Sequence, residues 1–398
     1  MQTTYNIIDA NIVTPQEVIR GVLRVENGII VEIIPQNAYN PAKYQVEEID
    51  ANGNLLLPGI IDIHTDAIDK EIMPRKSADF PIDIAFRELE RRMSGCGITT
   101  VYHSMHLGYK KAEESANSKY NRKQIFEEVY ACTQKNTIIN NKIHLRFELT
   151  GTYHYDLVLE VMKNGWVDLL SIMDHRPGQG QYGNVTPEGW AKNMGLTLEQ
   201  ATQELEELRN TDCIEGERLK KLIDLAIELG ISVASHDDDS IEKVEQMHAI
   251  GIDISEFPIN APAAKRALEL GMHTVAGASN VIRGGSLSGN INVADAIQQG
   301  LIQSLCSDYY PPSILHALFM LVAKGILSYP EAANLTALNP AKAVKIDKET
   351  GSIEVGKQAD LIIVELQDNL PLVTHTFVEG NLAASASSTQ KVKEKLWM

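Results

Sequence analysis

The central part of the chain, from Pro58 to about Asn339, alternates short runs of branched apolar residues with longer amphipathic segments. Short branched apolar runs are typical of buried strands, and apolar residues at helical spacing are typical of surface helices. Strands that alternate with helices favour an α/β fold. The predicted strands are residues 60–64, 99–103, 144–149, 168–173, 232–236, 254–257, 274–277 and 304–308. Helices are predicted between most of them, for example at 82–93, 217–229, 241–249 and 261–270.

Eight such strands over about 250 residues match the size of a (β/α)8 barrel. Both ends of the chain look different, because they consist of short strands and turns such as Asn27-Gly28. Neither end is long enough to bury a core alone. We therefore predict a barrel domain at residues 57–345 and one small β-sandwich domain built from residues 1–56 plus 346–398. The insert at 176–216 is expected to arch over the barrel mouth.

Composition narrows the range of partners. The chain has 36 basic and 53 acidic side chains, so its net charge of −17 argues against nucleic acid or an anionic membrane as a partner. The four cysteines form no C-x-x-C pair, which favours a reducing compartment. No targeting segment or membrane-length apolar run is visible, so we predict a cytoplasmic protein that acts on a small molecule. The oligomeric state stays open, a homo-oligomer included.

His64 and Asp66 are the most informative residues of the sequence. They end a strongly apolar run, and residues two apart in a strand point to the same side. An imidazole and a carboxylate would therefore project together from the C-terminal end of the first barrel strand. Active sites of this fold lie at the C-terminal ends of the strands.

Further polar side chains recur at the ends of later strands. Imidazoles and carboxylates together suit zinc, manganese or iron, and this number of them is enough for one or two divalent metal ions. Zinc is the first expectation. The additional candidates are Glu148, His175, His236 and Asp308.

Three neighbouring features are less specific. His103 and His106 follow the second strand. If they have a functional role, we expect contact with substrate in preference to metal binding. The acidic run 237–239 is expected to include a carboxylate that orients a ligand histidine, with the other acids in solvent. Tyr309 and Tyr310 either line the pocket or pack in the protein interior.

A glycine-rich loop, Arg283 to Asn290, follows the seventh strand. Glycines let backbone N–H groups turn toward an anion, and loops after strands seven and eight of this fold often bind phosphate. The alternative is an ordinary loop. Other basic residues near the mouth, which together favour a phosphorylated substrate, are Lys70, Arg75, Arg146 and Arg176.

The segment 178–183 matches the G-x-G-x-x-G dinucleotide fingerprint. Pro177 separates it from the strand, and no clear helix starts at its third glycine. We therefore reject a nicotinamide cofactor.

Several segments resemble the amidohydrolase superfamily, namely Leu-Pro-Gly-Ile-Ile-Asp-Ile-His (57–64), Gly-Ile-Thr-Thr-Val (97–101) and Gly-Lys-Gln-Ala-Asp-Leu (356–361). Within it, the likeness is greater to the diphosphatases of phosphonate utilisation, which act on α-D-ribose 1-methylphosphonate 5-triphosphate. The segments that carry this likeness include His-Thr-Asp (64–66), His-Leu-Arg-Phe-Glu-Leu (144–149), Met-Asp-His-Arg-Pro-Gly-Gln (173–179), Arg-Gly-Gly-Ser (283–286) and Ser-Asp-Tyr-Tyr-Pro (307–311).

The resemblance implies hydrolysis of that triphosphate to the 5-phosphate and pyrophosphate by a metal-bound hydroxide. Asp308 would orient or deprotonate the water, and Arg283 would stabilise charge on the phosphoryl oxygens. The implied metal ligands are His64, Asp66, Glu148, His175, His236 and Asp308. The expected substrate-binding residues are Lys70, Arg75, Arg283, Gly284, Gly285 and Ser286.

Two positions depart from the diphosphatase pattern. Leu287 replaces a histidine of the glycine-rich loop, and Ala67 replaces an asparagine. Hydrolysis of a C–N bond, as in a cyclic amide hydrolase or a deaminase, is therefore the alternative function. A barrel that serves only as a binding subunit is a third interpretation, and it predicts that no metal binds.

Overall fold

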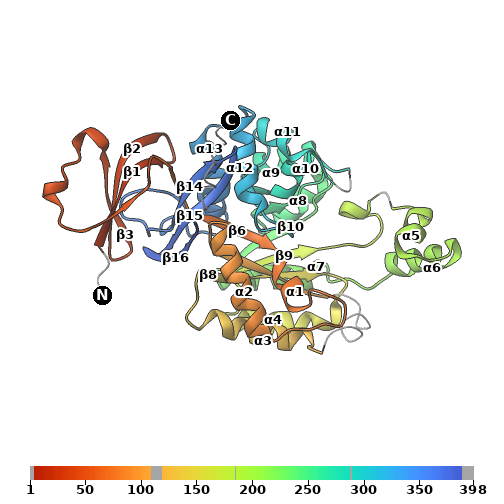
Figure 1. The fold of residues 1–398 in the computed structure, drawn as a ribbon. Coiled ribbons are helices and arrows are strands. Elements are labelled where there is room, and N and C mark those ends of the chain that lie inside the picture. Colours follow the sequence, from red (N-terminus) through yellow and green to blue (C-terminus); the bar gives the residue numbers. More distant parts are fainter. Residues whose placement is uncertain (1–3, 109–118, 184, 287–288, 388–398) are drawn as a thin grey trace, which may run out of the picture.

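The computed structural model describes residues 4–108, 119–183, 185–286 and 289–387. It consists of a parallel barrel and a second sheet to which both ends of the chain contribute (Figure 1). The predicted fold, a (β/α)8 barrel with a small domain from both ends, is confirmed.

The barrel contains all of the predicted strands, each pairing in parallel with its neighbour in sequence. Two backbone hydrogen bonds join the first strand to the last: Asp308 N donates to His64 O at 3.0 Å, and Asp66 N donates to Asp308 O at 2.6 Å. The barrel therefore closes at the residues predicted to bind metal. Its strands are β6 (Ile60–Thr65), β7 (Ile98–Leu107), β8 (Asn140–Glu148), β9 (Leu169–Met173), β10 (Ser232–His236), β11 (Ile254–Glu256), β12 (His273–Gly277) and β13 (Ser304–Cys306).

Helices surround the barrel and bury their apolar faces against its strands (Figure 1). The four helices predicted from the sequence are all present, and their observed ends lie within two residues of the predicted ends. Among the described residues, no helix combines the length and the apolar character needed to cross a membrane. The helices are α1 (Ala67–Ile72), α2 (Ile82–Gly95), α3 (Arg122–Thr133), α4 (Tyr155–Lys163), α7 (Gly216–Glu228), α8 (Ile241–Ala249), α9 (Ala261–Glu269), α10 (Ala278–Arg283), α11 (Val293–Gln298), α12 (Ser313–Ala323), α13 (Tyr329–Ala333) and α14 (Asn339–Ala343).

The second sheet has the order β16-β15-β14-β5-β1-β2-β3, and β4 pairs with β1. Strand β5 of the N-terminal end pairs antiparallel with β14 of the C-terminal end, so neither end forms this sheet alone. Its apolar face buries side chains from both ends, such as Ile12, Leu56 and Phe377. The strands are β1 (Thr4–Val13), β2 (Val18–Glu26), β3 (Ile29–Pro35), β4 (Glu47–Asp50), β5 (Leu55–Pro58), β14 (Leu361–Gln367), β15 (Leu370–Val378) and β16 (Asn381–Ser385).

The insert covers the barrel mouth only in its first turn. Gly180 N donates to Asp239 Oδ2 at 2.8 Å, and the Tyr182 ring meets the edge of His175 at 5.6 Å between centroids. The two helices that follow, α5 (Pro187–Met194) and α6 (Leu198–Arg209), project away from the barrel (Figure 1). The expectation that the whole insert arches over the mouth is therefore wrong for these helices, which pack on each other.

Candidate metal centre

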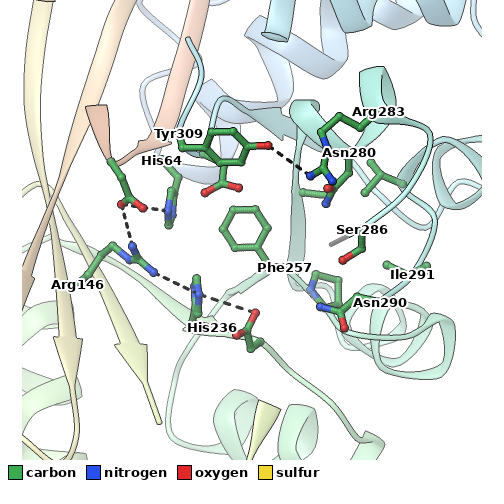
Figure 2. A pocket seen from close by; sticks show the side chains of 16 residues that line it. His64, Arg146, His236, Phe257, Asn280, Arg283, Ser286, Asn290, Ile291 and Tyr309 are labelled. Carbon is green, nitrogen blue, oxygen red and sulfur yellow. Dashed lines mark hydrogen bonds and ion pairs between the residues drawn. The ribbon is translucent and has the colours of Figure 1, made fainter. Parts of the chain in front are cut away.

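A pocket of about 320 Å³ opens at the C-terminal ends of the barrel strands (Figure 2). Two kinds of predicted residue meet there. Of the predicted metal ligands, His64, Asp66, His236 and Asp308 line it, and of the predicted substrate residues, Arg283 and Ser286 do. Closure of the barrel thus brings residues from the first, fifth, seventh and eighth strands to one place.

Two sets of side chains in this region could each hold a metal ion. The first group is His64, Asp66 and Asp308, and the second group is His175, His236 and Asp237. Within each group the ligand atoms lie within 4.8 Å of one another. The rings of His64 and His236 are 5.9 Å apart, so the two groups are adjacent.

The second group fits a divalent cation because it contains buried atoms without partners. Among the described residues, His175 Nε2 and Asp237 Oδ2 have no hydrogen-bond partner, although they lie only 3.8 Å apart. A buried polar atom without a partner costs free energy, and a cation between these two atoms would remove that cost.

Glu148 lies beside His175, another of the predicted ligands. Its Oε2 lies 2.7 Å from His175 Nδ1, and its Oε1 accepts the His175 backbone N–H at 3.0 Å. A carboxylate on Nδ1 leaves Nε2 of the same ring for metal binding. The structure therefore has Glu148 orient His175, while its own binding to a metal stays a prediction.

Left-handed backbone marks three residues at the mouth. Asp237, Phe257 and Asp308, which follow β10, β11 and β13, have φ values of 54°, 56° and 63°. Such conformations are unfavourable for residues other than glycine, and they cluster at functional sites. Burial also raises the pKa of Asp308, although His64 opposes this effect. A raised pKa suits a carboxylate that must accept a proton near neutral pH.

Arg146 connects the two groups. Its Nη1 donates to Asp66 Oδ1 at 2.8 Å, and its Nη2 lies 3.3 Å from His236 Nε2 (Figure 2). Nη1 also lies 2.6 Å from His106 Nε2, so that histidine faces the centre as well. A metal ion on His236 Nε2 requires Arg146 Nη2 to withdraw, because one lone pair cannot serve both. The sequence contains a signal for the inward direction of Arg146, because residues 144, 146 and 148 alternate along one strand and point to the same side.

The predicted substrate residues divide into two sets. Arg283 Nη1 lies 3.5 Å from Tyr309 Oη, and Lys70 Nζ stands 5.0 Å from the centre of the Tyr309 ring, so both cations border the pocket. Arg75 is exposed and is not part of the described lining. Gly284 and Gly285 follow α10 and also lie outside that lining, while Leu287 falls outside the described residues.

The acidic run 237–239 is more buried than predicted. Asp238 is fully buried and accepts hydrogen bonds from the Ser235 and Ser255 hydroxyls at 2.6 and 2.5 Å. The expectation that all but one of these acids lie in solvent is wrong, because Asp237 and Asp238 are both buried. His103 points away from the pocket, packs on Phe86 and contacts Asn141 Oδ1 at 2.8 Å. The metal ligands predicted from the sequence do not include three residues of the candidate site, namely Asp237, Arg146 and Glu256.

Comparisons with known proteins agree with this geometry. Residues 200–393 match the family model described as the amidohydrolase family. The chain is 32% identical to the alpha-D-ribose 1-methylphosphonate 5-triphosphate diphosphatase of Escherichia coli K12, over 94% of this chain and 98% of the relative. It is 23% identical to the imidazolonepropionase of Thermoplasma acidophilum, over 85% of this chain and 84% of the relative.

Solved structures extend the comparison of the fold. The dihydropyrimidinase from Brevibacillus agri superposes with a TM-score of 0.63 at 15% identity, covering 96% of this chain and 95% of the other. The strand-end histidines and carboxylates, the closed barrel and the 32% identity over nearly the whole chain lead to one conclusion. The chain belongs to the amidohydrolase superfamily.

Proposed function

We propose that the protein is a metal-dependent phosphohydrolase that cleaves α-D-ribose 1-methylphosphonate 5-triphosphate, or a related ribose 5-triphosphate, to the 5-phosphate and pyrophosphate. The observation that carries the proposal is the position of cations in an acidic chain. Although the net charge is −17, Arg146 and Arg283 line one pocket beside both candidate metal groups, and Lys70 borders it. Cationic side chains around a metal site suit a polyphosphate.

The first and second groups would hold one or two divalent ions, and we propose zinc because each group combines histidine with carboxylate. A bound divalent ion supplies Lewis acidity and lowers the pKa of a coordinated water to about 7. Six potential ligands also allow manganese or iron.

The side chains of this protein would share the remaining work. Asp308 accepts the proton of the attacking water, for which its burial and raised pKa suit it. Arg146 and Arg283 bind phosphoryl oxygens, and Ser286 donates a hydrogen bond from the glycine-rich loop. Water adds to phosphorus, a P–O bond between the first and second phosphoryl groups breaks, and pyrophosphate leaves.

Hydrolysis of a cyclic amide is the second candidate function. The similarity to an imidazolonepropionase favours it, as do the apolar side chains of Phe257, Ile291 and Val293 in the pocket. The same proton acceptor would then serve attack on carbon in place of phosphorus.

Phosphorus NMR of the zinc-loaded protein with α-D-ribose 1-methylphosphonate 5-triphosphate tests the proposal. We expect pyrophosphate and the 5-phosphate to appear together in equal amounts. If metal-loaded, folded protein leaves the triphosphate intact but opens a cyclic amide, the second candidate replaces the first.

A further inference from the structure

Glu256 is a buried carboxylate on a barrel strand that the proposed chemistry does not use. It ends β11, is 1% exposed, and contacts two histidines that line the pocket. Its Oε1 is 2.6 Å from His64 Nδ1, and its Oε2 is 2.8 Å from His236 Nδ1. The Ser171 hydroxyl donates a third hydrogen bond to Oε2 at 2.8 Å. One carboxylate thus holds a histidine of the first group and a histidine of the second.

These contacts require a proton on Nδ1 of both rings. An ionised carboxylate can only accept hydrogen bonds, so each Nδ1 must carry a proton. In a neutral imidazole the proton on Nδ1 leaves the Nε2 lone pair free, which is the form that coordinates a metal. Figure 2 shows both rings at the pocket wall, and their Nε2 atoms contact pocket residues, namely Asp66 at 3.9 Å from His64 and Arg146 at 3.3 Å from His236.

Glu256 does not fit the role of a metal ligand itself. His64, His144 and Glu256 do form a third compact set of potential ligand atoms. However, metal–ligand bonds of about 2.0–2.1 Å in a tetrahedral site separate neighbouring ligand atoms by roughly 3.3 Å. The 2.6 Å between Glu256 Oε1 and His64 Nδ1 is a hydrogen-bond distance and leaves no room for an ion between them.

We infer that Glu256 is a positioning residue that holds His64 and His236 in the metal-binding tautomer and couples the two candidate metal groups. The inference rests on the proposed metal-dependent function. It predicts that loss of this single carboxylate weakens metal binding at one group or at both. If Glu256 only supported the barrel, its loss would lower stability without a specific effect on metal binding.

Glu256→Gln is the informative variant, because an amide has one accepting oxygen and one donating nitrogen. The donating nitrogen cannot face a protonated Nδ1, so one histidine must move its proton to Nε2 and lose its lone pair toward the pocket. We expect the zinc dissociation constant, measured by competition with a chromophoric chelator, to rise by about 10–100-fold. The visible spectrum of the cobalt-loaded protein should change as well.

Glu90→Gln is the matched control. Glu90 lies on α2 and is also fully buried, and its Oε1 accepts hydrogen bonds from Ile138 N at 2.8 Å and Asn141 Nδ2 at 2.9 Å. This variant should lose stability yet bind zinc and cobalt like the wild type. Equal zinc affinity in wild type and Glu256→Gln would overturn the inference and leave the proposed function intact. A wild-type protein that binds no metal would overturn both.

A second measurement applies if Glu256→Gln does not fold. Long-range proton–nitrogen NMR of the metal-free wild type reports which ring nitrogen carries the proton, and His64→Gln and His236→Gln variants assign the signals. We expect both histidines to carry it on Nδ1. A proton on Nε2 of either ring would show that Glu256 does not set the tautomer.

Discussion

Arg146 Nη1 lies 2.8 Å from Asp66 Oδ1, and this ion pair places a permanent positive charge between the two candidate metal groups. The Arg146 side chain is only 7% exposed, so water screens the charge weakly. Burial raises the pKa of Asp66, but Arg146, His64 and Lys70 outweigh burial and hold that pKa below its ordinary value. Asp66 therefore remains a carboxylate, ready for a metal ion, across the physiological range.

Replacing Arg146 with methionine should separate charge from packing, since methionine keeps much of the side-chain volume. We expect kcat/KM for the triphosphate to fall by about 100-fold, the loss that removal of one donor to a developing anion typically causes. Zinc content should be retained, because a competing cation has been removed. Steady-state kinetics and metal analysis of the same preparation measure both quantities.

Arg122→Met provides the comparison. Arg122 pairs with Asp69 at 3.0 Å outside the described pocket lining, and this pair is partly exposed. We expect kcat/KM within about twofold of the wild type, as for most partly exposed ion pairs. An Arg146→Met protein as active as Arg122→Met would exclude Arg146 from phosphate binding.

The sequence predicted the barrel because strand-like and helix-like segments alternate along the central part of the chain, a pattern that is visible locally. The His64 and Asp66 pair was visible for the same reason, since alternation along one strand fixes their common direction. The role of Glu256 was not, because its partners are 192 and 20 residues away in the sequence, and its contact with His64 forms only when the barrel folds. Local pattern likewise could not distinguish Glu148 as a metal ligand from Glu148 as the partner of His175.

Asp308→Asn removes the proposed proton acceptor. We expect kcat to fall by about 10²–10⁴-fold, the usual contribution of a general base, while circular dichroism shows an unchanged fold. Asp239→Asn is the control, because that carboxylate accepts a hydrogen bond from Gly180 N at 2.8 Å but is not part of the described pocket lining. Near-normal turnover by Asp308→Asn would refute its assigned role.

Arg283→Ala tests the phosphate site of the glycine-rich loop. Because Arg283 lines the pocket beside Tyr309, we expect kcat/KM for the triphosphate to fall by about tenfold or more, equivalent to ~1.4 kcal/mol. Arg75→Ala should change it by less than about twofold, because the exposed Arg75 side chain is not among the described lining residues. Equal losses in the two variants would show that Arg75 reaches the substrate after all.

Asp237 and Asp238 are adjacent in sequence and should differ sharply in their roles. Asp237→Asn should weaken zinc binding by about 10–100-fold, since Asp237 Oδ2 is a buried atom without a partner beside His175. Asp238→Asn should retain zinc but lower the free energy of unfolding by about 1–3 kcal/mol, because it disturbs two buried serine contacts. Zinc titration and urea unfolding of both variants measure the contrast, and the reverse pattern would exchange their roles.

Acid should destabilise the protein partly through His103. Burial disfavours the imidazolium and lowers the pKa of His103 from 6.5 to about 4, although the Asn141 contact opposes the change. Between these values the unfolded chain binds a proton that the folded protein excludes, so stability is lost as pH falls from 6.5 toward 4. At pH 4.5 the expected loss from this one residue is roughly 2–3 kcal/mol.

Urea unfolding of wild type and His103→Gln at pH 7 and 4.5 isolates that contribution, since all other titrating groups are shared. Glutamine can still donate to Asn141 Oδ1 but cannot bind the proton, so the wild type should lose about 2–3 kcal/mol more than the variant over this interval. His248→Gln, at the exposed end of α8, should lose as much as the wild type. If His103→Gln and wild type lose the same free energy, His103 is accessible to protons in the folded barrel, and its burial behind Phe86 does not control the acid response.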